Sequence, residues 1–388
     1  MSKLINQGSY GCVYHPSLLC SGRPSSNNKL VSKLQARSWS TTNEIEIGKI
    51  IMEIENYHLY FLPVTQSCDI DISSVDNNLI SNCKVVNKHK KRSQSEFVLT
   101  KMKYLENISF IKYLQSSNTT PRYALFKIMQ SYKSLATGLK ILNDNEIVHH
   151  DLNHGNILFD ATTGIPIIID FGLAINMADF TPDNKALLNE HFFVDAPDYW
   201  PWSLDVHIIN YIVQRPNASD NASDNASDNA SDNASDTASD TASDNIEIDY
   251  DELINIANKW VDALPIIPLF SRQFKDQFVE KCYAYLEQFI GKTHDEAFSI
   301  LMQHYKTWDN YALNMLFLSV IHFTFKDKIP NTNFISEFIQ LTLINISPDP
   351  TERMSYDETI NYISEITSRE NSAEDITQTL SSVSVSDR

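Results

Sequence analysis

Basic residues are scarce in this sequence, and their scarcity excludes one broad class of function. The 388 residues include 31 Lys and Arg against 49 Asp and Glu, which gives a formal net charge of −18 at pH 7. A protein that binds nucleic acid through the phosphate backbone needs clustered Lys and Arg to displace counterions. The acidic balance therefore argues against general nucleic-acid binding.

Cysteines are also few, and their spacing fits no common ligand pattern. The chain has five of them, at Cys12, Cys20, Cys68, Cys83 and Cys282. The number is odd, and neither a Cys-x-x-Cys pair nor a Cys/His cluster appears, which disfavours both a zinc site and a disulfide framework. We expect reduced thiols in an intracellular, cytoplasmic protein.

Long apolar runs are missing as well. No segment approaches the roughly 20 apolar residues that are needed to span a bilayer. The N-terminal stretch Met1–Ser9 is polar and lacks the apolar segment of a signal peptide. We therefore expect no association with a membrane.

One segment stands apart by its repetition. From Asn217 to Asp244 the tetrapeptide Asn-Ala-Ser-Asp, or its variant Thr-Ala-Ser-Asp, occurs seven times in succession. The repeat has no large apolar side chain to bury, so it cannot offset the entropy lost on ordering. It is predicted to be a disordered insertion.

The stretch that carries chemistry runs from His149 to Asn156 and reads His-His-Asp-Leu-Asn-His-Gly-Asn. The motif Asp170-Phe-Gly follows it, after the apolar run Ile165–Ile169. Phosphoryl transfer needs a group that orients the attacking hydroxyl, together with oxygen ligands for Mg²⁺. Asp151 is the predicted base, and Asn156 and Asp170 are the predicted metal ligands.

Both motifs, at this spacing, resemble the catalytic loop and the Asp-Phe-Gly motif of the eukaryotic-type protein kinase family, and the three roles above follow that pattern. The resemblance implies a two-lobed α+β fold, with a small sheet-rich N-lobe and a larger helical C-lobe. It further implies transfer of the γ-phosphoryl group of ATP to Ser/Thr hydroxyls of protein substrates, with ATP and Mg²⁺ as cofactors. The sequence carries no signal for an oligomeric state.

The start of the chain resembles the Gly-rich loop of this family. Gly8-Ser-Tyr-Gly11-Cys-Val13 stands where that loop belongs, although the family's earlier glycine is replaced by Asn6. Glycines let the backbone approach phosphates and present N–H groups to them. We therefore expect Gly8, Gly11 and Val13 to line the nucleotide site.

Val31-Ser-Lys33 resembles the family's Val-Ala-x-Lys strand, so Lys33 would bind the α and β phosphates. The lysine needs a carboxylate to hold it. Glu44 fits best, because it opens the next predicted helix. Glu46 remains the alternative, since a two-residue slip is easy in this segment.

The domain prediction divides the chain at residue 104. Residues 1–104 form the N-lobe, with β-branched runs at Lys29–Leu34 and Phe97–Met102 around a helix at Asn43–Ile54. Residues 105–365 form the C-lobe, which contains the insertion at 217–244. The Ser/Thr-rich acidic tail 366–388 is predicted to be disordered. Apolar spacing predicts four helices in the second half of the C-lobe, at Ile246–Leu264, Phe274–Ile290, His294–Tyr305 and Asn333–Ile346.

Two further elements of the resemblance lie downstream. Ala196-Pro-Asp198 resembles the Ala-Pro-Glu that closes the activation segment, and Asp349-Pro-Thr-Glu-Arg353-Met-Ser resembles the family's Asp-Pro-x-x-Arg-x-Ser. In the family the Glu and the Arg form a buried pair. Asp198 and Arg353 are predicted to form it here.

The departures from the family pattern are also informative. His150 replaces the usual Arg of the catalytic loop, and Asn153 replaces the Lys that lies near the γ-phosphate. Trp200-Pro-Trp-Ser-Leu-Asp205 replaces the usual Asp-x-Trp-Ser-x-Gly, so the anchoring Asp of that helix is either missing or moved to Asp205. The divergence, together with the Asn- and Ile-rich composition, resembles kinases encoded by large DNA viruses, which would place the protein in a host cell or a virion.

Two other functions remain open. The segment His-x-Asp-Leu-x-x-Gly-Asn-Ile-Leu also resembles small-molecule phosphotransferases of the aminoglycoside and choline kinase type. The Gly-rich loop, Ala196-Pro-Asp198 and Arg353 argue against that alternative. The other alternative is an inactive scaffold, which would have no need to keep Lys33 and Asp151.

Overall fold

A computed structural model describes residues 2–8, 11–89, 97–114, 121–180, 185–214, 246–325 and 333–369. The chain forms two compact units. The first comprises Met1–Thr181, Lys306–Ile346 and Glu352–Arg388, and the second comprises Pro182–Tyr305 and Ser347–Thr351. Both segments of the second unit are therefore inserted within the sequence of the first.

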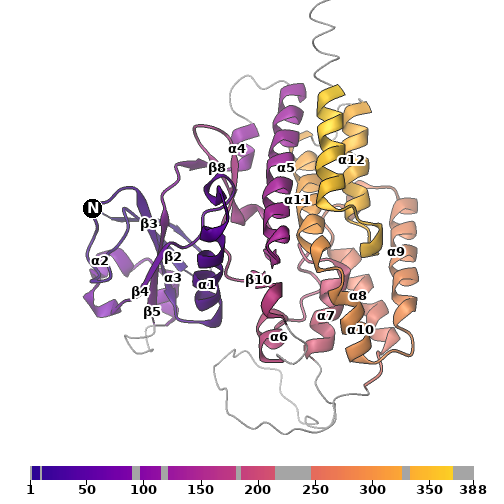
Figure 1. Ribbon diagram of the computed structural model, residues 1–388, viewed down its shortest axis with the longest axis horizontal. Coiled ribbons are helices and arrows are strands. Elements are labelled where there is room, and N and C mark those ends of the chain that lie inside the picture. The colour runs from indigo at the N-terminus through magenta and orange to yellow at the C-terminus, as the bar shows by residue number, and fades with distance from the viewer. Residues whose placement is uncertain are drawn as a thin grey trace, which may run out of the picture. The chain divides into compact units, whose positions relative to one another are not determined.

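The first unit begins with a five-stranded antiparallel sheet (Figure 1). Lys33 pairs with Val13 on one side and with Thr100 on the other. Directly paired residues point to the same face of a sheet, so these three side chains share one face. The strands are β1 (Lys3–Gln7), β2 (Gly11–His15), β3 (Leu30–Ala36), β4 (Gln66–Asp69) and β5 (Phe97–Lys103), in the order β1-β2-β3-β5-β4.

The helix α1 (Trp39–Glu53) follows β3 and carries Glu44. Ser38 caps its first turn by accepting a hydrogen bond from the backbone N–H of Thr41. The buried residues Thr41, Glu44, Gly48 and Ile51 recur every three or four positions, and Ile47 is next to Gly48, so all five lie on one face of the helix. The sequence-predicted helix at Asn43–Ile54 is confirmed, with a start four residues earlier.

The opposite face of the sheet is also covered. The short helices α2 (Asn77–Ile80) and α3 (Lys84–Lys88) contribute to a buried cluster with residues of β2, β3 and β5. Side chains in this cluster include Tyr14, Leu34 and Leu99, which alternate with the residues of the Lys33 face. The central strands β2, β3 and β5 therefore have buried side chains on both faces of the sheet.

Two disulfide bonds lie in this region, which corrects the expectation of reduced thiols. Cys12 of β2 is bonded to Cys83 with a Cα–Cα distance of 5.8 Å, and Cys20 is bonded to Cys68 of β4 with a distance of 6.0 Å. Only Cys282 is a free cysteine among the described residues. The prediction was wrong because the partners are brought together by the sheet and not by sequence spacing.

Helices form the rest of the first unit. A continuous apolar core joins α5 (Pro121–Asp144), α11 (Trp308–Phe325), α12 (Asn333–Asn345) and a last helix at residues 356–369. Short strands complete this unit. β7 (Ile147–Val148) pairs with β10 (Ile175–Asn176), and β8 (Ile157–Asp160) pairs with β9 (Pro166–Ile168) and with β6 (Asn107–Ile108), which precedes α5 in sequence. The short helix α4 (Phe110–Leu114) precedes α5.

The first eleven residues of the helix α11 are buried on all sides, and the helix was not predicted from the sequence. Every residue from Trp308 to Leu318 is buried. Polar side chains inside this core bond to one another: Tyr132 of α5 donates to Asn314 Oδ1 at 2.9 Å, and Asn310 donates to Asn345 Oδ1 at 3.2 Å. A buried polar network of this kind holds neighbouring helices in one register.

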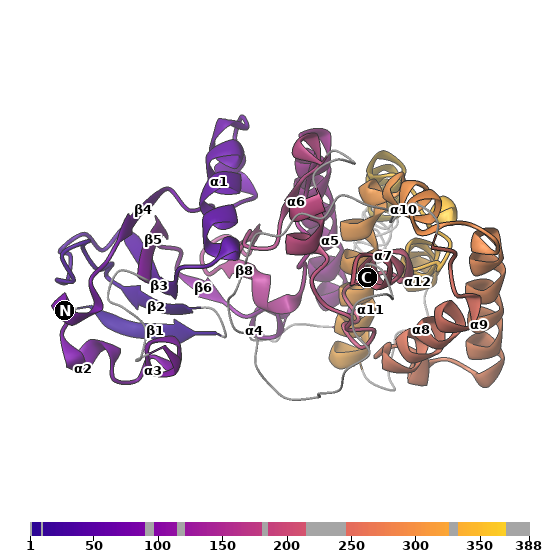
Figure 2. The same cartoon turned by 90° about the horizontal axis from the view of Figure 1, so that it is seen from below.

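The second unit is helical (Figure 2 shows the same elements from another direction). Its described helices are α6 (Lys185–His191), α7 (Leu204–Gln214), α8 (Tyr250–Ala263), α9 (Arg272–Leu286) and α10 (His294–Met302). The predicted helices at 246–264, 274–290, 294–305 and 333–346 correspond to α8, α9, α10 and α12. The helix α8 begins later than predicted because Asp249 accepts hydrogen bonds from the N–H groups of its first turn.

The predicted α+β fold, with a sheet-rich N-terminal part and a helical majority, is confirmed. The repeat at 217–244 and most of the tail lie outside the described residues. The predicted domain boundary at residue 104 lies inside the first compact unit, and it stays a prediction. No helix in the part of the chain that the structure describes is long and apolar enough to cross a bilayer.

Candidate active site

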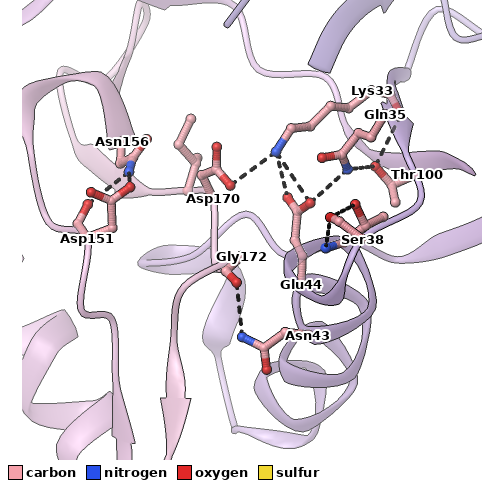
Figure 3. A network of polar contacts seen from close by, with 12 residues as sticks. Lys33, Gln35, Ser38, Asn43, Glu44, Thr100, Asp151, Asn156, Asp170 and Gly172 are labelled. Carbon is pink, nitrogen blue, oxygen red and sulfur yellow. Dashed lines mark hydrogen bonds and ion pairs between the residues drawn. The ribbon is translucent and has the colours of Figure 1, made fainter. Parts of the chain in front are cut away.

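Lys33 lies between two carboxylates (Figure 3). Its Nζ is 3.3 Å from both carboxylate oxygens of Glu44 and 3.1 Å from Oδ1 of Asp170. The contact is made by Glu44, and the exposed Glu46 on the same helix takes no part in it. The structure thus brings together a strand, a helix and the Asp-Phe-Gly segment at one ammonium group.

Burial alone would lower the pKa of Lys33. The charges of Glu44 and Asp170 outweigh that effect, so the pKa of Lys33 lies above its ordinary value and the side chain stays protonated. An ammonium group held in this way can bind an anion without first losing its charge. This property suits a group that meets phosphate oxygens.

A second pair of polar side chains supports Glu44 from behind. Gln35 is buried and donates from Nε2 to Glu44 Oε2 at 2.9 Å and to Thr100 Oγ1 at 3.2 Å. Burial raises the pKa of Glu44, and the hydrogen bond from Gln35 acts with the Lys33 charge to oppose that rise. Gln35 and Thr100 therefore hold the Glu44 carboxylate toward Lys33.

The predicted Gly-rich loop has two glycines in different surroundings. The N–H of Gly8 donates to the carbonyl of Gly11 at 2.9 Å and closes a turn. A Cβ added at Gly11 would lie 2.9 Å from Cγ of Lys33 and 3.1 Å from Cγ of Gln35, whereas one added at Gly8 would meet nothing within 4 Å. Only Gly11 is required by the close packing of β2 on β3.

This contrast gives a matched pair of variants. Gly11→Ala should lower the free energy of unfolding by about 1–3 kcal/mol, because the new methyl group overlaps the stems of Lys33 and Gln35. Gly8→Ala should change it little. Thermal denaturation of the nucleotide-free protein compares the two. Equal melting temperatures would show that β2 can move away from β3 without loss.

The predicted base is held by two amides. Asn156 donates from Nδ2 to Oδ2 of Asp151 at 2.8 Å, and Asn153 donates to Oδ1 at 3.0 Å. Asn153 is itself fixed, since its Oδ1 accepts from the N–H of Gly155 at 2.8 Å. Hydrogen bonds to both oxygens set the direction of the Asp151 carboxylate.

The backbone before Asp151 is anchored from α11. The N–H groups of His149 and His150 donate to the two carboxylate oxygens of Asp309, at 2.6 and 2.9 Å. Burial raises the pKa of Asp309, although the nearby His149 and these donors act against the rise. His150 has a φ of 64°, so this anchor also holds a backbone conformation that side chains disfavour.

The sequence left open whether the anchoring Asp is missing or moved to Asp205, and the structure shows Asp309 as the residue that anchors this backbone. Asp205 belongs to α7 in the second unit, whereas Asp309 holds the catalytic loop from within the first. A sequence signal for it existed, because Asp309-Asn-Tyr-Ala-Leu has the spacing of the Asp-x-Trp-Ser-x element that was sought near Trp200.

The Asp-Phe-Gly segment is fixed by its aromatic residue. Phe171 is 1% exposed and makes edge-on contacts with two other rings. Its ring centre lies 6.1 Å from that of Phe61 and 5.1 Å from that of His149. The ring Nε2 of His149 lies 3.0 Å from the carbonyl oxygen of Ile169. These contacts join the catalytic loop to the segment that carries Asp170, whose φ of 63° is also unusual.

The donor chemistry of Asn156 and Asp170 fits Mg²⁺. The Nδ2 of Asn156 is directed at Asp151, so its amide oxygen is the atom that could bind a cation. The Asp170 side chain is 35% exposed, in contrast to the Glu44 side chain at 5%. Hard divalent cations prefer carboxylate and amide oxygens. Among the described residues, no cluster of three or more His, Cys, Asp or Glu side chains forms a different metal site.

The predicted pair of Asp198 with Arg353 joins residues of the two units, and it stays a prediction. Within the first unit, Arg353 is 6% exposed and donates from Nη1 to Thr307 Oγ1 at 3.0 Å. Its guanidinium carbon also lies 5.3 Å from the ring centre of Tyr311. Arg353 thus contacts the segment that leads into α11.

Comparison with known proteins gives a consistent result. The family model described as "Protein kinase domain" matches residues 73–363. Among curated proteins, the chain is 30% identical over 95 residues to "Mitogen-activated protein kinase kinase kinase 15" of Mus musculus, which covers 22% of this chain and 7% of that protein. "Mitogen-activated protein kinase kinase kinase 5" of Homo sapiens matches with the same identity and coverage. The chain thus aligns with only a small part of each relative.

Proposed function

Because the chain belongs to the protein kinase family, we propose that it is a serine/threonine protein kinase, which transfers the γ-phosphoryl group of Mg·ATP to a hydroxyl of a protein substrate. The observation that carries the proposal is the contact of Lys33 with both Glu44 and Asp170. A protein substrate agrees with the names of the matched relatives, because each name describes a kinase that acts on another kinase.

Each residue has a defined task in this proposal. Lys33 binds the phosphates of ATP, since Glu44 keeps it charged and directed into the site. Asp151 accepts the proton of the substrate hydroxyl, with its carboxylate oriented by Asn153 and Asn156. When bound, Mg²⁺ neutralises charge on the phosphates, and Asn156 and Asp170 would hold it.

Asp170 offers a test of this proposal. Asp170→Ala should weaken Mg·ATP binding and reduce phosphorylation of a mixture of generic proteins by more than tenfold, because a carboxylate ligand and a partner of Lys33 are both lost. Asp357→Ala is the control, since that side chain is 75% exposed and lies in a different part of the unit. The assay is incubation with labelled ATP followed by phosphopeptide mapping.

The same assay distinguishes the alternatives. Phosphate on Ser and Thr supports the proposal. A wild-type chain that binds Mg·ATP but labels no protein would contradict it and favour either a small-molecule phosphotransferase or a scaffold. Addition of aminoglycosides and choline as acceptors then separates those two.

A further inference from the structure

Asn43 lies one residue before Glu44 on α1 and contacts a distant part of the chain (Figure 3). Its Nδ2 donates to the carbonyl oxygen of Gly172 at 3.1 Å and to that of Ala174 at 2.8 Å. These carbonyls follow Asp170 by two and four residues. The two segments that present carboxylates to Lys33 are therefore joined to each other by a single amide.

The approach of these two segments is close at a second point. A Cβ added at Gly172 would lie 2.6 Å from Oγ of Ser40, in the first turn of α1. Gly172 thus lets the backbone after Asp170 come against the helix. The contact of Asn43 forms part of a packed junction and does not stand alone.

The amide of Asn43 has no part in capping its own helix. Ser38 caps the first turn of α1, and both hydrogen bonds of the Asn43 Nδ2 leave the helix. A primary amide offers two N–H donors, which matches the two carbonyl acceptors. A carboxylate of the same size could not replace it, because it has no hydrogen to donate at neutral pH.

We propose that Asn43 is a positioning residue, which holds α1 against the segment after Asp170 and so keeps Glu44 and Asp170 together at Lys33. The inference rests on the proposed function and adds to it the means by which the site is held in its active arrangement. The tie consists of neutral hydrogen bonds. It therefore needs neither a charge at position 43 nor a phosphate on the segment.

The test compares three substitutions at this position with a control on the same helix. Asn43→Ala removes both donors, Asn43→Asp keeps the size but opposes two carbonyls with a carboxylate, and Asn43→Gln keeps the amide on a longer stem. Glu46→Ala is the control, because Glu46 is exposed. Circular dichroism first establishes that each full-length variant is folded at the assay temperature.

Asn43→Ala and Asn43→Asp should raise the Kd for Mg·ATP roughly tenfold and lower kcat/KM for a protein substrate by at least as much, because the competent arrangement becomes a minor state. Asn43→Gln should recover part of both losses, and Glu46→Ala should match the wild type. A purely structural role would lower the melting temperature without moving the Kd of the folded protein.

The outcomes separate this inference from the proposed function. If the wild type binds Mg·ATP but phosphorylates no protein, the proposed function fails. The Kd for Mg·ATP of the Asn43 variants, compared with that of the wild type, then still decides the role of Asn43. If Asn43→Ala and Asn43→Asp both bind Mg·ATP within twofold of the wild type, the positioning role is wrong. A wild type that does not bind Mg·ATP contradicts both.

Discussion

Replacement of Asp151 by Asn is expected to lower the rate of phosphoryl transfer by roughly 10²–10⁴-fold, which is the usual effect of losing a positioned general base. Asn keeps the shape of the side chain but cannot accept the proton of a hydroxyl. The Kd for Mg·ATP should change little, because Lys33 contacts Glu44 and Asp170 and not Asp151. The effect should thus appear in kcat.

Single-turnover measurement of phosphate transfer, together with a separate titration of Mg·ATP, checks this expectation. Asp144→Asn is a suitable control, since Asp144 lies at the end of α5 with its side chain 56% exposed. The Asp151→Asn side chain places an amide opposite the amides of Asn153 and Asn156. A small rise in the Kd for Mg·ATP would therefore still agree with the prediction. Turnover within threefold of the wild type would show that another group accepts the proton.

Loss of the anchor on α11 should affect stability and catalysis together. Asp309→Ala leaves the N–H groups of His149 and His150 buried without an acceptor, and each such donor costs about 1–3 kcal/mol. Burial raises the pKa of Asp309, so removing the buried charge returns part of that loss. We therefore expect the free energy of unfolding to fall by about 2 kcal/mol in total, which is the lower end of the range for two unsatisfied donors.

Asp309→Ala should also lower kcat, and we expect this loss of rate to be the more conspicuous effect of the substitution. Asp151 follows the anchored N–H groups directly, and a displacement of about 1 Å at a reacting group can reduce the rate 10²-fold. Asp309→Asn, which retains one acceptor oxygen, should lie between the wild type and Asp309→Ala in both kcat and melting temperature. Asp276→Ala on α9 serves as the control for a surface carboxylate. An Asp309→Ala protein that melts with the wild type and keeps its kcat would contradict the anchoring role.

The motif residues could be located from the sequence because their spacing is local and their chemistry is specific. Lys33, Glu44, Asp151, Asn156 and Asp170 lie in the same unit, and the structure places Lys33 against Glu44 and Asp170. The sequence favoured Glu44 but left Glu46 open as the alternative, since both lie near the start of the same helix. It depends on which side of α1 meets the sheet.

The supporting residues could not be predicted in the same way. Gln35 supports Glu44 only because the register of β3 on β5 places it near Thr100. Asn43 acts through backbone carbonyls that leave no mark in the sequence. The four paired cysteines are separated by 71 and 48 residues, so their pairing follows from the arrangement of strands.

The helix α11 shows a different reason for failure. An amphipathic helix is recognised by apolar residues on one face. All residues from Trp308 to Leu318 are buried, so apolar side chains occur all round the helix and the periodic signal disappears. The anchor Asp309 was missed together with the helix that carries it.

The place of Asp309 in the chain has a consequence for biosynthesis. The hydrogen bond from His149 to Asp309 spans 160 residues, and that from Tyr132 to Asn314 spans 182. Translation proceeds from the N-terminus, so the ribosome completes every motif of the catalytic loop and residues 182–305 of the second unit before α11 emerges. Until α11 emerges, a nascent chain therefore carries the predicted catalytic loop without the carboxylate that anchors it, and the loop can take its anchored form only after residue 309 has been made.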